Sequence, residues 1–247
     1  MATNFAGKVA FVTGGSRGIG AAIVQRLVDG GATVAFTYKG SKVAAEELVA
    51  AIQAKGGRAL ALYADAADAA ALTQAVNDAA RQLGKIDILV NNAGVFSMAS
   101  VADLALDDFD RMLNVNVRAV FVASKAALAH MGEGGRIINI GSCNAERMPF
   151  AGGATYAMSK AALVGLVKGM ARDLGPRGIT VNNVQPGPTN TDMNPAAGDF
   201  AGAMHDLMAL KRHARPEEIA AMVAYVASEE AGFVTGASLT IDGGFNA

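Results

Sequence analysis

The sequence of 247 residues contains one cysteine, Cys143, only three histidines and no tryptophan. A single cysteine excludes an intramolecular disulfide, and no Cys/His cluster has zinc-ligand spacing, so we expect no metal. No histidine lies near Cys143 in the sequence, which favours a small buried side chain over a nucleophile. The scattered histidines are expected at the surface or in loops: His130, His205 and His213.

Strong charge of either sign and long apolar runs are also lacking. The net charge is −1, without the basic stripe typical of nucleic-acid-binding proteins. No apolar run is long enough to span a bilayer, and residues 1–8 lack the apolar stretch of a signal peptide. We therefore expect a cytoplasmic protein with no nucleic-acid or membrane partner. Hydrophobic residues make up 52% of the chain, enough for a sizeable core.

Short β-branched apolar runs alternate with longer alanine-rich stretches along the chain. Strands are predicted at 8–13, 33–37, 59–63, 86–90, 136–140, 179–184 and 238–241, and helices at 21–29, 44–54, 68–83, 109–130, 156–174 and 216–227. This alternation predicts an α/β fold, a doubly wound parallel sheet with helices on both faces. Since no linker interrupts it, residues 1–247 are expected to form a single domain.

Residues 189–215 interrupt the alternation with small residues, proline turns and scattered methionine. A long irregular insertion in a compact domain is often a binding loop or lid, so we predict that it walls a pocket. The alternative is a helical excursion without a role. From the register we expect mainly apolar pocket walls: Val95, Phe96, Asn144, Phe150, Met193 and Met204.

A glycine-rich loop, Thr-Gly-Gly-Ser-Arg-Gly-Ile-Gly at residues 13–20, separates the first predicted strand from the first helix. Gly14 permits a sharp turn, Gly18 lets the backbone approach a pyrophosphate, and Gly20 lets helix and strand pack closely. The position of the loop predicts a dinucleotide phosphate site. Its expected members are Gly14, Ser16, Arg17, Gly18, Ile19 and Gly20.

The end of the second predicted strand indicates which dinucleotide is bound. Enzymes that use NAD usually place an acid there for the ribose 2′-hydroxyl, but no acid occurs between Asp29 and Glu46. Lys39 follows Tyr38 at this end, and Arg17 of the glycine loop can reach the same region. Because a 2′-phosphate is negatively charged, this pattern favours NADP(H).

Tyr156 and Lys160 lie four residues apart, so a helix presents them on one face. A cation beside a phenol lowers its pKa from about 10, which lets the phenol exchange a proton with a carbonyl or alcohol oxygen near neutral pH. Ser142 follows a predicted strand whose end faces the ligand in a parallel sheet, where its hydroxyl can hydrogen-bond the reacting oxygen.

Over nearly its full length the pattern resembles the short-chain dehydrogenase/reductase family. The matching pieces, in family order and spacing, are residues 13–20, Asp65, residues 91–94, Asn116, Ser142, Tyr156, Lys160, Pro186 and Gly187. The resemblance implies a Rossmann-type sheet and a homo-oligomer, commonly a homotetramer.

The resemblance also implies roles for the chemical residues. Tyr156 would be the general acid/base, Lys160 would hold the nicotinamide ribose and lower the Tyr156 pKa, and Ser142 would orient the substrate oxygen. Asn116 would support a water chain that resupplies protons. Asn114, two residues earlier, is a competitor for that role, but Asn116 fits the family register better.

For the coenzyme, the resemblance implies that Asp65 contacts adenine, although Ala66 stands where the family often has a bulkier aliphatic residue. Asn91 and Gly94 would line the adenosine side and steady the sheet, and Ala93 would also bind the coenzyme. The nicotinamide end would be framed by Pro186, Gly187, Thr189 and Thr191.

Two functions follow. The first is NADPH-dependent reduction of a ketone or β-keto ester; the second is a cyclic-di-GMP-binding regulatory protein on a reductase scaffold, with little turnover. The complete set Ser142, Tyr156 and Lys160 favours the enzyme. A carrier-protein substrate would need a basic patch, for which Lys211, Arg212 and Arg215 are candidates, but Asp192, Asp199 and Asp206 lie around them. We therefore expect a free, small and apolar carbonyl or alcohol substrate.

Overall fold

The computed structural model describes residues 4–247, so residues 1–3 of the predicted N-terminal stretch lie outside the described part. Seven strands form one sheet in the order β3-β2-β1-β4-β5-β6-β7, and every neighbouring pair is parallel. The strands are β1 (Val9–Val12), β2 (Thr33–Tyr38), β3 (Arg58–Tyr63), β4 (Ile88–Asn91), β5 (Arg136–Ile140), β6 (Thr180–Pro186) and β7 (Ser238–Ile241). The strand order reverses between β1 and β4, which confirms the predicted doubly wound Rossmann-type sheet.

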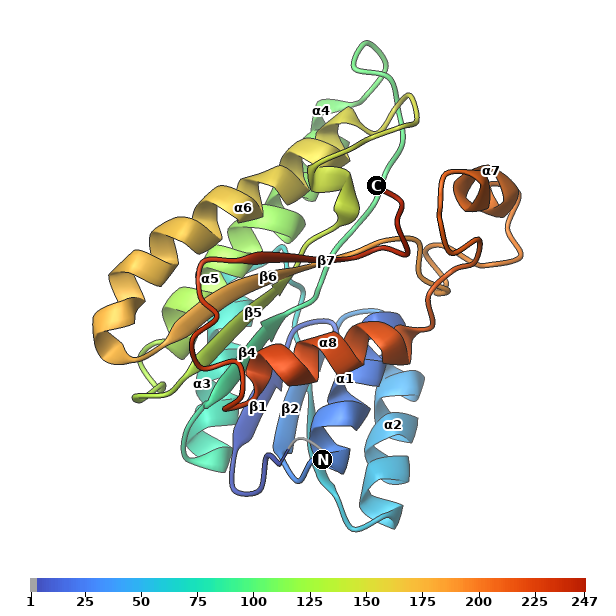
Figure 1. Ribbon diagram of the computed structural model, residues 1–247. Coiled ribbons are helices and arrows are strands. Elements are labelled where there is room, and N and C mark those ends of the chain that lie inside the picture. Colours follow the sequence, from blue (N-terminus) through green and yellow to red (C-terminus); the bar gives the residue numbers. More distant parts are fainter. Residues whose placement is uncertain (1–3) are drawn as a thin grey trace.

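Helices cover both faces of this sheet (Figure 1). They are α1 (Gly18–Asp29), α2 (Lys42–Ala54), α3 (Ala69–Leu83), α4 (Leu106–Leu113), α5 (Ala119–Ala127), α6 (Ala154–Leu174), α7 (Ala201–Asp206) and α8 (Pro216–Ala227). One buried core joins α1, α2 and α8 to the sheet, and a second joins α3, α5 and α6 to the opposite face.

The strands read as continuous apolar runs because both of their faces are buried. Along β1, Ala10 and Val12 belong to the core under α1 and α8, whereas Phe11 belongs to the core under α3 and α5. β2 repeats the alternation, with Phe36 on the first side and Ala35 on the second. Period-two geometry therefore divides one apolar run between two cores.

The structure differs from the predicted helices at three places. The helix expected at 21–29 begins at Gly18, because the glycine loop itself forms the first turn. The helix expected at 109–130 is α4, a π-helical turn at Asn114–Arg118 and α5, and it ends by Ala127. The segment 189–215 contains a short helix, α7, that was not predicted. Within residues 4–247, no helix is long and apolar enough to cross a membrane.

Candidate active site

The glycine loop after β1 has the shape of a phosphate cradle. Gly14 and Gly18 have positive φ angles of 66° and 53°. A Cβ on Gly14 would lie 3.0 Å from the Ala93 Cα, and one on Gly20 would collide with the Gly14 carbonyl oxygen. At the start of α1, Arg17 makes no side-chain cap bond within residues 4–247. The first amides of α1 are therefore available to an anion, and this part of the chain fits a dinucleotide pyrophosphate.

Asn92 fixes the loop and was missed in the sequence. Its side-chain amide donates to the carbonyl oxygens of Thr13 (3.0 Å) and Gly14 (2.9 Å). The Thr13 hydroxyl in turn accepts from the amides of Asn92 and Ala93, both at 3.0 Å. The signal was present, since Asn92 lies inside the matching residues 91–94.

Both cations predicted near the ribose are engaged with carboxylates. Lys39 Nζ lies 2.5 Å from Asp65 Oδ2, and Arg17 Nη1 lies 3.3 Å from Asp192 Oδ2. Burial works to raise the pKa of Asp65, but hydrogen bonds from Lys39 and the Ala67 amide hold it below its ordinary value. The structure thus brings Lys39 and Asp65 together, at the ends of β2 and β3, on the glycine-loop side of the sheet.

Asn91 lies in the interior of the sheet. It is buried, and its amide donates to Ser124 Oγ (3.1 Å) and to Asn139 Oδ1 (2.9 Å), so it ties β4 to β5 and to α5. Gly94, by contrast, borders the chemical residues. A Cβ added there would lie 3.6 Å from Lys160 Nζ, within ordinary contact distance.

Tyr156 and Lys160 lie in the first two turns of α6, which packs against the short turn that begins at Ser142, after β5. Lys160 is buried, and its Nζ donates to the Ile140 carbonyl at 2.9 Å and lies 5.8 Å from the centre of the Tyr156 ring. Ser142 Oγ accepts from the Asn144 amide at 3.1 Å. The rings of Phe96 and Tyr156 pack edge to face with centroids 4.9 Å apart.

The predicted acidification of Tyr156 is wrong in this structure. Burial raises the pKa of Tyr156 to about 12, although a hydrogen bond with Ser142 opposes the rise. Burial also lowers the pKa of Lys160 to about 8. The physical reason is that both groups are removed from water, and the Lys160 ammonium points at a backbone carbonyl rather than at the phenol oxygen.

Asn116 occupies the centre of the π-helical turn and is buried. Its Oδ1 accepts from the Val95 amide at 2.9 Å, and its Nδ2 donates to the Val95 carbonyl and the Ser159 hydroxyl, both at 3.0 Å. This side chain therefore links the irregular segment that follows β4 to α6. Asn114 is half-buried in the same turn.

The other residues expected to line the pocket lie in different places in the structure. Asn144 contacts Ser142, and Met193 is exposed on the segment 189–215. Phe150 packs instead in a small cluster with Cys143, Met208 and Phe245. Cys143 is buried as expected, and burial raises the pKa of its thiol to about 12.

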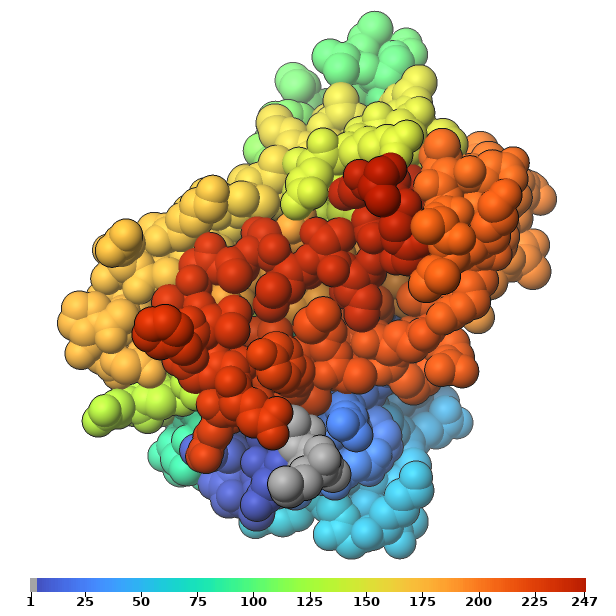
Figure 2. Space-filling model, viewed as in Figure 1, coloured from blue at the N-terminus to red at the C-terminus, as the bar shows by residue number. Residues whose placement is uncertain are grey.

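The segment from Gly187 to Arg215, here called the excursion, leaves the end of β6 and returns to α8. Pro186 and Thr189 are buried. Thr191 lies over Gly18, since a Cβ added to Gly18 would be 3.2 Å from Thr191 Cγ2. Figure 2 shows the orange atoms of the excursion against the dark red C-terminal end, where the Leu210 amide donates to the Gly243 carbonyl at 2.8 Å. The excursion thus borders the phosphate loop at one side and the chain end at the other.

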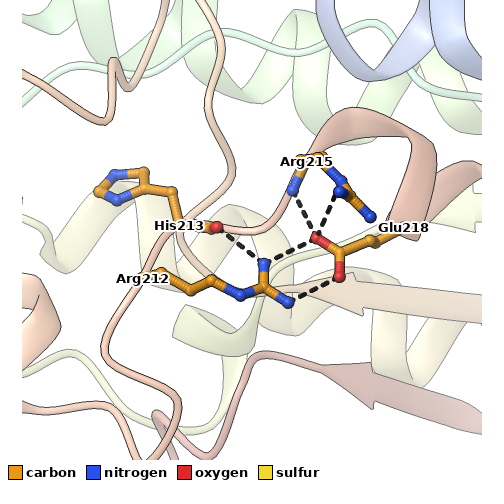
Figure 3. A network of polar contacts seen from close by, with 4 residues as sticks. All are labelled: Arg212, His213, Arg215 and Glu218. Carbon is orange, nitrogen blue, oxygen red and sulfur yellow. Dashed lines mark hydrogen bonds and ion pairs between the residues drawn. The ribbon is translucent and has the colours of Figure 1, made fainter.

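The base of the excursion is anchored by Glu218 in α8 (Figure 3). Arg212 donates two parallel hydrogen bonds to its carboxylate, at 2.7 and 2.8 Å, and the Arg215 amide donates a third at 2.8 Å. The hydrogen bond from Arg212, followed by that from the Arg215 amide, lowers the pKa of Glu218 to about 2. Two of the three cations considered for a docking patch are therefore paired with Glu218.

His213, expected at the surface or in a loop, lies in the loop before α8 and not at the surface. It is buried under α7, with Nδ1 2.8 Å from Nε2 of His205 and Nε2 3.3 Å from Asn194 Oδ1. The unpredicted helix α7 is the reason, because it folds back over this residue and supplies His205.

A family model described as enoyl-(acyl carrier protein) reductase matches residues 14–246. The chain belongs to the short-chain dehydrogenase/reductase family. A short-chain dehydrogenase/reductase from Serratia marcescens is 65% identical, covers 98% of this chain and 99% of its own, and superposes with a TM-score of 0.97. A short-chain dehydrogenase from Burkholderia cenocepacia, solved in complex with NADP, is 56% identical, with coverages of 99% and 100% and the same TM-score.

A curated relative has a different description. The cyclic-di-GMP-binding biofilm dispersal mediator protein of Escherichia coli is 53% identical over 243 residues, which are 98% of this chain and 99% of that protein. Membership of the reductase family is therefore clear, while relatives within it differ in their described activities.

Proposed function

We propose that this protein is an NADPH-dependent reductase that converts the carbonyl of a small apolar ketone or β-keto ester to an alcohol. The observation that carries the proposal is the convergence of Ser142, Tyr156 and Lys160 at the end of β5. When bound, the reduced nicotinamide supplies the hydride. The residues of the chain supply orientation and the proton.

The protonation state of Tyr156 suits reduction. With a pKa of about 12, the phenol keeps its proton at neutral pH and can donate it to the oxygen of a carbonyl that becomes an alkoxide. Ser142 adds a second hydroxyl for the same oxygen. Lys160 holds a positive charge below pH 8 and would bind the ribose, while Asn116 positions the segment at Val95.

The proposed preference for NADP(H) depends on the residues expected near the adenosine ribose. Lys39 and Arg17 supply positive charge, no acid occurs between Asp29 and Glu46, and the Burkholderia relative is described with NADP. We assign the coenzyme contacts to Gly14, Ser16, Arg17, Gly18, Ile19, Gly20, Tyr38, Lys39, Asp65, Ala93, Gly94, Tyr156, Lys160, Pro186, Gly187, Thr189 and Thr191, with Asn91 behind them steadying the sheet.

A free small substrate fits better than a carrier-bound one. Phe96 packs on Tyr156 and Met193 is exposed on the excursion, which favours an apolar ligand. Arg212 and Arg215 are paired with Glu218, which leaves Lys211 as the remaining cation of the patch considered above. An acidic carrier protein would therefore find little positive charge there.

Oligomer and location are further parts of the proposal. Large exposed apolar side chains, among them Leu106, Phe121 and Phe233, favour burial between copies, consistent with a homotetramer. We propose that residues 1–247 act as one domain in the cytoplasm, without a nucleic-acid partner.

The second candidate function is sequestration of cyclic-di-GMP, favoured by the identity to the E. coli relative. The test is to follow the near-ultraviolet absorbance of NADPH with a panel of ketones and β-keto esters, and to titrate cyclic-di-GMP in a calorimeter. Substrate-dependent NADPH consumption supports the reductase. Absence of turnover on every carbonyl, together with measurable cyclic-di-GMP binding, would reverse the assignment.

A further inference from the structure

Lys39 and Asp65 are brought together by the sheet. β2 and β3 are parallel neighbours in which Tyr38 is opposite Tyr63, so the residues that follow both strands emerge side by side. The Tyr38 and Tyr63 rings pack edge to face with centroids 5.9 Å apart, and the Ala64 amide donates to the Tyr38 carbonyl at 2.9 Å. The ion pair at 2.5 Å is therefore a product of the strand register.

The two partners are held unequally. Asp65 Oδ1 accepts from the Ala67 amide at 3.0 Å, and its side chain is 29% exposed. The Lys39 side chain is 56% exposed, so its ammonium is the more mobile group. Asp68, another carboxylate after β3, caps α3 through the Ala70 and Ala71 amides, and within residues 4–247 it forms no ion pair with Lys39. Asp65 is thus a fixed negative charge beside Lys39, the cation assigned to the ribose end under the proposed function.

We propose that Asp65 limits how strongly this protein prefers NADPH over NADH, because it competes with the coenzyme 2′-phosphate for Lys39. The inference rests on the proposed function. A 2′-phosphate that approaches Lys39 has either to displace the Asp65 carboxylate or to share the ammonium with it at the cost of repulsion between two anions. NADH carries no charge at that position and does not meet this cost.

The expected change in NADP⁺ affinity is small because the Lys39–Asp65 ion pair is partly exposed to solvent. Half-exposed ion pairs are worth up to about 1 kcal/mol, which corresponds to a change in affinity of about fivefold at most. Asp65→Asn keeps the side-chain size and the acceptor for the Ala67 amide while it removes the charge. It should therefore strengthen binding of NADP⁺ relative to NAD⁺ by about threefold.

Calorimetric titration of the full chain with NADP⁺ and NAD⁺ measures this effect as the dissociation constant for NAD⁺ divided by that for NADP⁺. This ratio rises as the preference for NADP⁺ grows. Lys39→Met should reduce the preference for NADP⁺ by about tenfold or more, and Asp65→Asn added to it should change nothing further. Glu46→Gln is the matched control, since it removes the carboxylate partner of a different lysine, Lys42, on the adjacent α2. Asp65→Ser, which also keeps an oxygen for the Ala67 amide, replaces Asp65→Asn if that variant fails to fold.

An unchanged or lowered ratio in Asp65→Asn would overturn the inference, as would an equal rise in Glu46→Gln or in the Lys39→Met background. These outcomes differ from failure of the proposed function. A wild-type protein that binds neither dinucleotide, or prefers NAD⁺, contradicts the proposed coenzyme itself.

Discussion

The chemical end of the candidate active site is held by buried hydrogen bonds, whereas its ribose end is held by exposed ion pairs. Asn116 and Lys160 are almost fully buried, and each side chain bonds to a backbone group. Arg17 and Asp192 are 65% and 75% exposed. Buried polar groups lose much when a partner is removed, while exposed pairs lose little. The comparison implies that geometry is fixed at one end and coenzyme preference is tuned at the other.

The largest effect is expected at the chemical end, from Tyr156→Phe. This change removes the proton donor and keeps the ring that packs on Phe96. Turnover in a steady-state NADPH assay should fall by ~10²–10⁴-fold while the thermal unfolding temperature stays close to wild type. Turnover within a factor of two of wild type would show that another group supplies the proton.

Asn116→Ala tests the buried network itself. It removes hydrogen bonds to both backbone groups of Val95 and to Ser159, and leaves buried partners without them. The free energy of unfolding in urea should fall by about 3 kcal/mol. Asn114→Ala is the matched control, since within residues 4–247 the Asn114 side chain forms no hydrogen bond. Equal losses in the two variants would contradict the positioning role of Asn116.

Lys160→Met should affect activity and stability in opposite directions. Burial lowers the pKa of Lys160 from 10.5 to about 8, so protonated Lys160 destabilises the fold below pH 8 by roughly 3 kcal/mol, and the penalty fades as pH rises toward 10.5. The variant loses the bond to Ile140, worth about 1 kcal/mol. At pH 7 it should be more stable than wild type by about 2 kcal/mol yet inactive.

Urea unfolding of both proteins at pH 7 and pH 10 checks this expectation. The stability difference should narrow at the higher pH, because above pH 8 the folded lysine has lost its proton, and the free-energy cost of losing it falls as the pH approaches the unfolded pKa of 10.5. A difference that widens with pH, or a less stable variant at pH 7, would mean that the Lys160 ammonium is stabilised where it lies.

The smallest effect is expected from Asp192→Asn at the ribose end. The Arg17–Asp192 pair is exposed on both sides, so the free energy of unfolding should change by less than about 0.5 kcal/mol. Urea unfolding in low and high salt measures it. A loss comparable to that of Asn116→Ala would show that this ion pair holds the excursion on the glycine loop, and the contrast between the two ends would disappear.

Features set by local pattern were predictable from the sequence. The glycine loop, the Tyr156–Lys160 spacing and the strand that ends before Ser142 each depend on neighbours a few residues away. The strand–helix alternation predicted a parallel sheet with helices on both faces, and the burial of β1 on both sides agrees with it.

Features that depend on tertiary contact were not predictable. The π-helical turn exists where Asn116 reaches Val95, and the burial of His213 requires α7 to fold over it. The pairing of Lys39 with Asp65 needs β2 beside β3. The direction of the Tyr156 pKa shift depends on desolvation, which residue spacing does not reveal.

The most direct measurement is transfer of deuterium from NADPH labelled at the transferable position of the nicotinamide to a ketone that the protein consumes. Mass spectrometry of the product should find one deuterium on the carbinol carbon with the wild-type protein and almost no product with Tyr156→Phe. Alcohol that carries no deuterium, or NADPH loss without alcohol, would contradict the account.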